Sequence, residues 1–187
     1  MGRLIGISGS LRKASLNSAL LRAACELCPE SLEAASIRDI PLYDGDLEAT
    51  GTPDSVLRLK RRIVEADGLL LVSPEYNNSL PGVLKNTVDW LSRSLEDSPR
   101  VFLDKPVAVI GATPGGWGTL LCQDAWLSVF RGLGAHHWAG GRLLVSGAHR
   151  VFDDQAALVD EKVRERLEHF VRGFARFAAQ HAESGEG

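Results

Sequence analysis

Residues 4–17 of the chain read LIGISGSLRKASLN and decide the fold. The first four residues are apolar and have the length of a buried strand, and a hydroxyl-rich, basic turn follows them before a helical pattern begins. The first turn of a helix offers unpaired backbone N–H groups and the positive end of the helix dipole. A strand that feeds such a turn is therefore a place to bind a phosphate group.

The residue types in this turn suit an anion site. Gly9 lets the backbone leave the strand sharply, and Ser10 and Ser15 carry hydroxyl donors. Asn17 carries an amide, and Arg12 can present two parallel N–H groups to a phosphate. The turn has neither the Gly-Lys-Ser/Thr ending of a Walker A loop nor the further glycines of a dinucleotide-binding turn. A turn that only caps the following helix and carries an exposed arginine would have the same sequence pattern. Other stretches of the chain must therefore decide between a phosphate site and a turn that binds no ligand.

Size and charge limit the possible functions. The 187 residues have the size of one domain, and we expect a single domain over 1–181 with a disordered polar tail at 182–187. A net charge of −3 and a pI near 6.0 argue against a dedicated nucleic-acid-binding protein, which normally has a basic face. No apolar run approaches the length of a membrane span. We therefore expect neither nucleic acid nor membrane as a partner.

The three cysteines point to a reducing compartment. Cys25 and Cys28 have C-x-x-C spacing but do not match a redox or metal-binding motif. They lie inside a helical pattern, with no redox turn before it and no second pair of ligands. Together with Cys122 they are an odd number, and we interpret all three as buried structural thiols. The N-terminus shows no apolar signal region. The sequence predicts a cytoplasmic protein.

The order of the predicted elements indicates the fold class. Apolar residues three or four apart predict helices, and short unbroken apolar runs predict strands covered on both faces. The expected strands are 4–7, 33–37, 68–73 and 107–110, with a fifth within 135–145 that is placed at its 143–145 end, and the expected helices are 16–27, 53–63, 83–91, 120–133 and 159–177. Five strands alternating with five helices require right-handed crossovers on a parallel sheet. We predict an α/β protein, a flavodoxin-like three-layer sandwich with a five-stranded parallel sheet of order 2-1-3-4-5.

Three loops converge at one edge of this predicted sheet. The loops follow the first, third and fourth strands, and the later two contain Pro-Glu-Tyr-Asn-Asn at 74–78 and Pro-Gly-Gly-Trp-Gly at 114–118. The carboxyl ends of parallel strands form the usual ligand crevice of an open α/β sheet. We therefore expect the functional site there, with the phosphate at the first loop.

Three motifs, in this order along the chain, resemble those of the NADPH-dependent FMN reductase family, in particular its quinone and chromate reductase branch. The motifs are Gly-Ser-Leu-Arg-Lys-Ala-Ser-Leu-Asn at 9–17, Ser-Pro-Glu-Tyr-Asn at 73–77 and Leu-Lys-Asn-Thr-Val-Asp-Trp-Leu at 84–91. The resemblance spans nearly the whole chain, from the first strand through the fourth loop. It implies FMN as the cofactor, which agrees with a single phosphate site and no second nucleotide-binding segment.

The resemblance also implies which residues bind FMN. The first loop would surround the phosphate, the second would lie along the isoalloxazine ring, and a glycine pair in the loop after the fourth strand would border the far side of the ring. The residues implied are Ser10, Arg12, Ser15, Leu16 and Asn17 for the first loop, Pro74, Glu75, Tyr76 and Asn77 for the second, and Gly115 and Gly116 for the third.

By the same resemblance, the protein is expected to be an NAD(P)H-dependent oxidoreductase. Electrons would pass in two steps to a quinone or a similar small acceptor such as chromate, an azo compound or free flavin. Because the flavin supplies the chemistry, we expect no catalytic side chain, and Glu75 is expected to use its backbone more than its carboxyl group. NADH and NADPH both remain open as donors. An FMN-carrying electron-transfer protein of flavodoxin type is the alternative, although such carriers tend to be more acidic.

Two further stretches bear on partners and metals. The helix expected at 120–133 is apolar on more than one side, which predicts that a second subunit covers it in a homodimer or homotetramer. His136 and His137 are neighbours on a predicted strand and would point to opposite faces, a poor geometry for one metal ion. We therefore predict no metal site. Trp117 lies in the loop after the fourth strand and can reach the site.

Overall fold

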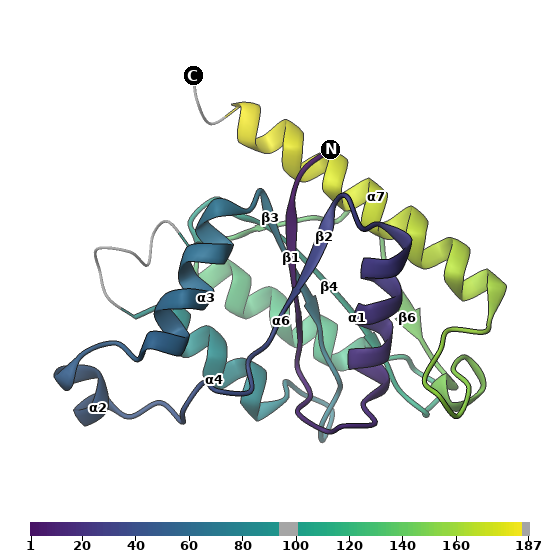
Figure 1. The fold of residues 1–187 in the computed structure, drawn as a ribbon, viewed down its shortest axis with the longest axis horizontal. Helices are drawn as coiled ribbons and strands as arrows, with labels where there is room; N and C mark the ends of the chain where they lie inside the picture. Colours follow the sequence, from purple (N-terminus) through teal and green to yellow (C-terminus); the bar gives the residue numbers. More distant parts are fainter. Residues whose placement is uncertain (94–100, 185–187) are drawn as a thin grey trace.

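The sheet of the protein lies between two layers of helices (Figure 1). The computed structural model describes residues 1–93 and 101–184. Its strands are β1 (Leu4–Ser8), β2 (Leu32–Ala35), β3 (Gly68–Val72), β4 (Pro106–Ala112), β5 (His136–His137) and β6 (Leu144–Val145). Its helices are α1 (Leu16–Leu27), α2 (Gly45–Thr50), α3 (Asp54–Glu65), α4 (Gly82–Leu91), α6 (Leu120–Gly132) and α7 (Glu161–Ser184), with a short 3₁₀ turn at Ala148–Arg150.

The predicted topology is confirmed. The strands pair in the order β2-β1-β3-β4-β5, and every pairing is parallel. Helices α1 and α7 cover one face of the sheet, and α3, α4 and α6 cover the other (Figure 1). Successive residues of β1, β3 and β4 therefore enter two different cores, which is why these strands read as unbroken apolar runs.

The fifth position of the sheet is divided between two short strands. β5 pairs with the beginning of β4, at Pro106 and Val107, whereas β6 pairs with its end, at Gly111 and Ala112. The sequence predicted a single fifth strand within 135–145, placed at its 143–145 end, so the division into two strands was not predicted. Between the two strands the chain passes around Trp138, whose ring packs on Phe170 and is approached closely by the backbone of Gly140. The chain therefore leaves the sheet between β5 and β6.

Other boundaries differ by short segments. Helix α2 was not among the predicted helices, and Asp44 caps its first turn by accepting a hydrogen bond from the backbone N–H of Asp46. The last helix was expected to begin at Val159, but this residue precedes α7 and is 57% exposed. Helix α7 continues to Ser184, so residues 182–184 of the expected tail are helical, and 185–187 lie outside the described residues. Within the described chain, no helix has the combined length and apolar character that crossing a bilayer requires.

Candidate functional site

The three predicted loops lie together at the carboxyl edge of the sheet, the lower edge in Figure 1. Backbone hydrogen bonds continue the ladder beyond the strands: the N–H of Gly9 donates to Val72 O at 2.9 Å, and that of Ser73 donates to Ile110 O at 2.8 Å. The N–H of Thr113 donates to Val145 O at 2.9 Å. Each loop therefore starts from a position fixed by its neighbour.

The first loop ends in a helix N-terminus with free donors. Ser15 caps α1, since its hydroxyl oxygen accepts a hydrogen bond from the N–H of Ser18 at 3.2 Å. The backbone N–H groups of Leu16 and Asn17 have no acceptor in the described part of the chain. Arg12 is exposed, and one of its terminal nitrogens donates to Ala14 O at 2.8 Å, which leaves the rest of the guanidinium free for a ligand.

Asn17 joins the first loop to the end of β4. Its side-chain NH₂ donates to Ala112 O, and its amide oxygen accepts from the N–H of Ala112, both at 2.9 Å. Asn17 is 4% exposed and Ala112 is 3% exposed, so both bonds are shielded from water. The sequence pointed to the amide as a phosphate donor, but this side chain links the first loop to β4, and its backbone N–H is the free group.

The second loop contains a tight two-residue turn. The backbone groups of Tyr76 and Ser79 pair in both directions, at 3.2 and 3.0 Å, around Asn77 and Asn78. Both asparagines have positive φ angles, 50° and 59°, which asparagine tolerates better than most side chains. The turn leaves Tyr76 48% exposed at the mouth of the candidate site. Pro74, by contrast, is buried against the first loop, where a Cβ on Gly9 would meet its ring at 3.0 Å.

Glu75 caps the helix that follows the β4 loop. Its carboxylate accepts a hydrogen bond at 3.0 Å from the N–H of Cys122 in the first turn of α6. A negative charge at this end of a helix also complements the helix dipole. That the backbone of Glu75 contacts the flavin remains a prediction. Its carboxyl group already has a structural partner, the N–H of Cys122. Because Glu75 and Cys122 lie far apart in the chain, no local pattern signals this cap.

A buried polar group stands behind the second loop. Ser73 is fully buried, and its hydroxyl lies 3.0 Å from Cys122 Sγ and accepts a hydrogen bond from Trp126 Nε1 at 3.0 Å. Burial raises the pKa of the Cys122 thiol to about 11. The thiol therefore stays protonated at neutral pH and is a structural group, as the sequence predicted.

The third loop offers open space beside its glycines. Gly115 and Gly116 are exposed, and a Cβ on Gly116 would meet no other atom within 4 Å. Gly115 is held by two hydrogen bonds, since its N–H donates to Thr113 Oγ1 at 3.3 Å and its carbonyl accepts from the N–H of Gly147 at 3.0 Å. Trp117 is 79% exposed. The glycine pair thus borders a surface onto which a flat group can fit.

The motif at 84–91 has a structural task. Asn86 accepts a hydrogen bond from the N–H of Tyr43 and donates one to Pro41 O, both at 2.8 Å. Trp90 Nε1 also donates to Pro41 O, at 2.9 Å, and the Trp90 ring meets Tyr43 edge-on at 5.0 Å. One face of α4 therefore holds residues 41–43 in place. Trp90 is fully buried.

Of the two cysteines in the C-x-x-C of the first helix, Cys28 is buried as predicted, whereas Cys25 is only half-buried. Cys25 and Cys28 are both free thiols on α1 and at its C-terminal cap. Burial raises the pKa of Cys25 to about 11 and also raises the pKa of Cys28. Neither thiol has the thiolate character that redox or metal chemistry requires.

Comparison with known proteins finds relatives that match nearly the whole chain. Residues 3–150 match the sequence profile of the NADPH-dependent FMN reductase family. The chain is 42% identical over 168 residues to an NAD(P)H-dependent FMN reductase of Pseudomonas aeruginosa, covering 89% of each chain. It is 39% identical over 183 residues to an NADPH:quinone oxidoreductase of Arabidopsis thaliana, covering 94% of this chain and 91% of the relative. Among solved structures it resembles FerB, a flavoenzyme NAD(P)H:(acceptor) oxidoreductase of Paracoccus denitrificans, with a TM-score of 0.85, 34% identity, and 97% and 99% of the two chains covered.

Proposed function

Because the chain belongs to the NADPH-dependent FMN reductase family, we propose that it oxidises NAD(P)H and passes the electrons to a quinone or a similar small acceptor. FMN is the cofactor of this family, and when bound it supplies the site that accepts and releases the hydride. The observation that supports the proposal most directly is the first loop, where a helix N-terminus with two free N–H groups faces the same sheet edge as the exposed glycines of the third loop.

The residues of the site fit FMN. The free N–H groups of Leu16 and Asn17, the hydroxyls of Ser10 and Ser15 and the free part of the Arg12 guanidinium are all donors, which is what a phosphate dianion needs. We assign the flat ring to the space between the second and third loops, next to the residues Pro74, Glu75, Tyr76, Asn77, Gly115 and Gly116. Gly115 and Gly116 carry no side chains that would fill this space.

In this assignment the protein binds and orients the reactants without a catalytic side chain. The carboxylate of Glu75 already accepts the N–H of Cys122, and the thiol of Cys122 is buried with a raised pKa. The tasks left to the chain are to hold the cofactor by its phosphate, to keep one face of the ring open and to align the nicotinamide against it. Exposed Tyr76 and Trp117 offer aromatic surfaces beside that opening.

The test of the proposal is steady-state and rapid kinetics of the FMN-loaded protein. We expect parallel double-reciprocal plots for NAD(P)H and a quinone, because donor and acceptor use the same open face in turn. Anaerobic mixing with NADPH or NADH should bleach the absorbance of the protein-bound flavin within the turnover time. Free FMN at the same concentration is the control and should bleach more slowly. Bleaching that takes many minutes with both donors at millimolar concentration would contradict the reductase and favour the electron carrier. A panel of quinone, chromate, azo dye and free flavin then ranks the acceptors.

We also propose that the protein is a homodimer or a homotetramer. On α6, Trp126 and Phe130 are buried, but Leu121 is 48% exposed and Leu127 is 40% exposed. Trp117, before the helix, is 79% exposed, and a second copy of the chain can cover such exposed apolar side chains.

Light scattering at micromolar protein should therefore give a mass of two or four chains. The double variant Leu121→Glu/Leu127→Glu should shift the mass toward the 20.2 kDa monomer, because two buried charges oppose association. Leu42→Glu is the matched control, since Leu42 is 81% exposed on a different part of the surface. A stable wild-type monomer would refute the oligomer and leave the reductase proposal intact.

We propose a cytoplasmic location for the protein. All three cysteines are free thiols in the structure. A chain with several unpaired cysteines suits a reducing compartment, where thiols are kept from forming disulfides.

A further inference from the structure

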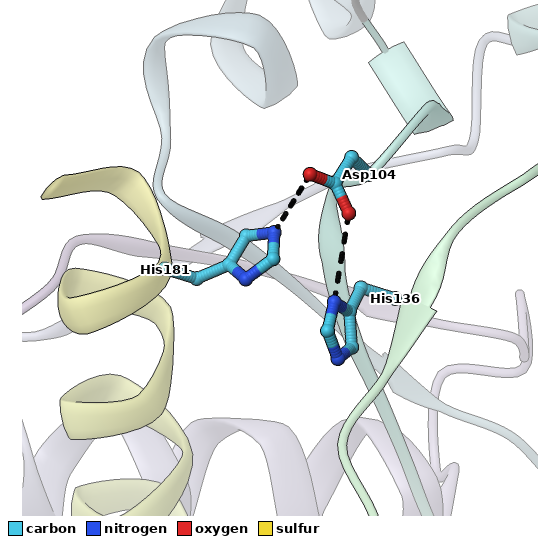
Figure 2. A group of neighbouring side chains, drawn as sticks. All are labelled: Asp104, His136 and His181. Atoms are coloured by element: carbon cyan, nitrogen blue, oxygen red, sulfur yellow. Dashed lines mark ion pairs between the residues drawn. The ribbon is translucent and has the colours of Figure 1, made fainter. Parts of the chain in front are cut away.

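Two histidines and an aspartate meet in one cluster of neighbouring side chains (Figure 2). Asp104 Oδ1 lies 3.5 Å from His136 Nδ1, and Asp104 Oδ2 lies 3.1 Å from His181 Nε2. One ligand atom from each of the three residues can be chosen so that all lie within 4.8 Å of one another. The carboxylate stands between the two imidazoles, and the rings of His136 and His181 meet edge-on at 4.5 Å.

The cluster joins three separate parts of the chain. Asp104 lies in the turn before β4, His136 begins β5, and His181 lies in the last turn of α7. Since β4 and β5 start here, this is the amino-terminal edge of the sheet, opposite the three loops of the candidate flavin site (Figure 1). A ligand at this cluster would thus occupy a site of its own.

The backbone and the neighbouring rings hold two of the residues in position. The N–H of Asp104 donates to Gly134 O at 2.7 Å, and the N–H of His136 donates to Lys105 O at 2.9 Å. Phe177, one turn before His181, meets the ring of His136 edge-on at 5.3 Å and stacks on that of His181 at 5.9 Å. The two imidazoles therefore share the ring of Phe177 as a support, and the backbone bond to Gly134 O fixes Asp104 beside them.

The positively charged side chain next to the cluster, that of Lys105, has its hydrogen-bond partner outside the cluster. Lys105 follows Asp104 in the chain, but its ammonium group donates to Ala66 O at 2.5 Å, at the C-terminal cap of α3. The carboxylate of Asp104 is thus free of a lysine partner and faces only the two imidazoles among the ion pairs of the described residues.

We propose that Asp104, His136 and His181 bind one divalent transition-metal ion, with Zn²⁺ the best match. Two imidazole nitrogens and a carboxylate oxygen are donors that zinc accepts in tetrahedral sites, with water as a fourth ligand. A site with two imidazole ligands is a poor match for Mg²⁺ and Ca²⁺, because these ions prefer oxygen ligands. Donor atoms around tetrahedral zinc lie about 3.3 Å apart, so the imidazoles need only small side-chain rotations to close around the ion.

Such an ion would fasten the C-terminal end of α7 to the edge of the sheet. The side chains of Asp104 and His136 are 71% and 45% exposed, so an ion can enter from solvent. The sequence predicted no metal site because His136 and His137 point to opposite faces, and they do: His137 stacks on Phe130 of α6, whereas His136 meets Phe177 of α7. The partners of His136 are distant in sequence, and the fold brings them together.

The experiment is a zinc titration of the full-length, FMN-loaded protein after removal of metals with EDTA and dialysis. Isothermal titration calorimetry should find one Zn²⁺ per chain with micromolar or tighter affinity. The variants Asp104→Asn, His136→Ala and His181→Ala should each bind zinc at least about tenfold more weakly, since loss of even an outer-shell partner costs that much. Asparagine is chosen at position 104 because the φ of Asp104 is +57°, which asparagine tolerates.

His169→Ala and His149→Ala are the matched controls, because both remove a histidine outside the cluster. They should leave the affinity for zinc unchanged. Zinc should also raise the melting temperature of the wild type and of both controls but not that of His181→Ala, because an ion that binds only the folded state stabilises it. This second readout remains valid if a variant folds less well.

Co²⁺ identifies the ligands by its visible spectrum. Nitrogen and oxygen ligands in a tetrahedral site should give d–d bands without a sulfur-to-metal charge-transfer band, and these bands should disappear in His136→Ala. Equal zinc affinity in the wild type and in His136→Ala and His181→Ala would overturn the proposal. So would a charge-transfer band that is lost in Cys25→Ser, or the absence of binding at millimolar zinc, which would leave the cluster as a set of ion pairs.

Discussion

Replacing Asn17 with Leu is expected to lower the free energy of unfolding by about 2 to 6 kcal/mol, because a buried polar group that loses its partner costs roughly 1 to 3 kcal/mol and two are affected. The N–H and C=O of Ala112 both bond to this side chain, and both are shielded from water. Leucine has nearly the same shape as asparagine but offers neither donor nor acceptor. Urea denaturation of the FMN-free protein, followed by far-UV circular dichroism, measures the effect.

Thr87→Val is the matched control for this prediction. The hydroxyl of Thr87 is also buried and donates to Val83 O at 2.8 Å, but that carbonyl lies inside α4 and keeps a helical partner. Removing the hydroxyl leaves no backbone group unpaired, so the loss should be about 0.5 to 1.5 kcal/mol. If Asn17→Leu cost no more than Thr87→Val, the link between the first loop and β4 would not contribute as the contacts indicate.

Arg12→Ala is expected to weaken FMN binding about tenfold to a hundredfold without unfolding the protein. A hydrogen bond from a charged donor is worth about 1.5 to 3 kcal/mol, and each 1.4 kcal/mol is a factor of ten in affinity. Arg12 is exposed, and among the described residues its side chain bonds only to Ala14 O, so the fold loses little. Titration of the FMN-free variant with FMN, followed by flavin fluorescence, gives the dissociation constant.

The control is Arg58→Ala, which removes an exposed arginine on α3 outside the candidate site. It should leave the dissociation constant of FMN unchanged. An unchanged dissociation constant of FMN in Arg12→Ala would show that Arg12 does not bind the cofactor and only bonds to Ala14 O in its own loop. Loss of binding together with a lower melting temperature in both variants would point to unfolding instead of a lost contact.

The fold was predictable because the strongest patterns are local. β1, β3 and β4 are apolar on both faces, and the residues around Ser15 and Pro53 mark helix starts that the structure places within one residue. The parallel order of the sheet followed from the alternation of strands and helices and is confirmed. These features depend on neighbours in the sequence and on the handedness of the crossovers.

The site was predictable only as a set of loops. The sequence indicated which loops meet, but the pairing of Asn17 with Ala112 and the cap that Glu75 places on α6 join residues with no local relation. The cluster of Asp104, His136 and His181 was missed for the same reason, since each residue alone looks like ordinary surface. Contacts of this kind are set by the packing of whole elements, which no short pattern contains.

The divided fifth position of the sheet protects the protein against unwanted association. An edge strand with a long row of free N–H and C=O groups is a template onto which a strand of another chain can add. Here the row is broken, because β5 and β6 contribute two residues each and the chain turns aside at Trp138 between them. A foreign strand would find no continuous ladder on this side. The same detour that shortens the sheet thus keeps its edge from seeding aggregates.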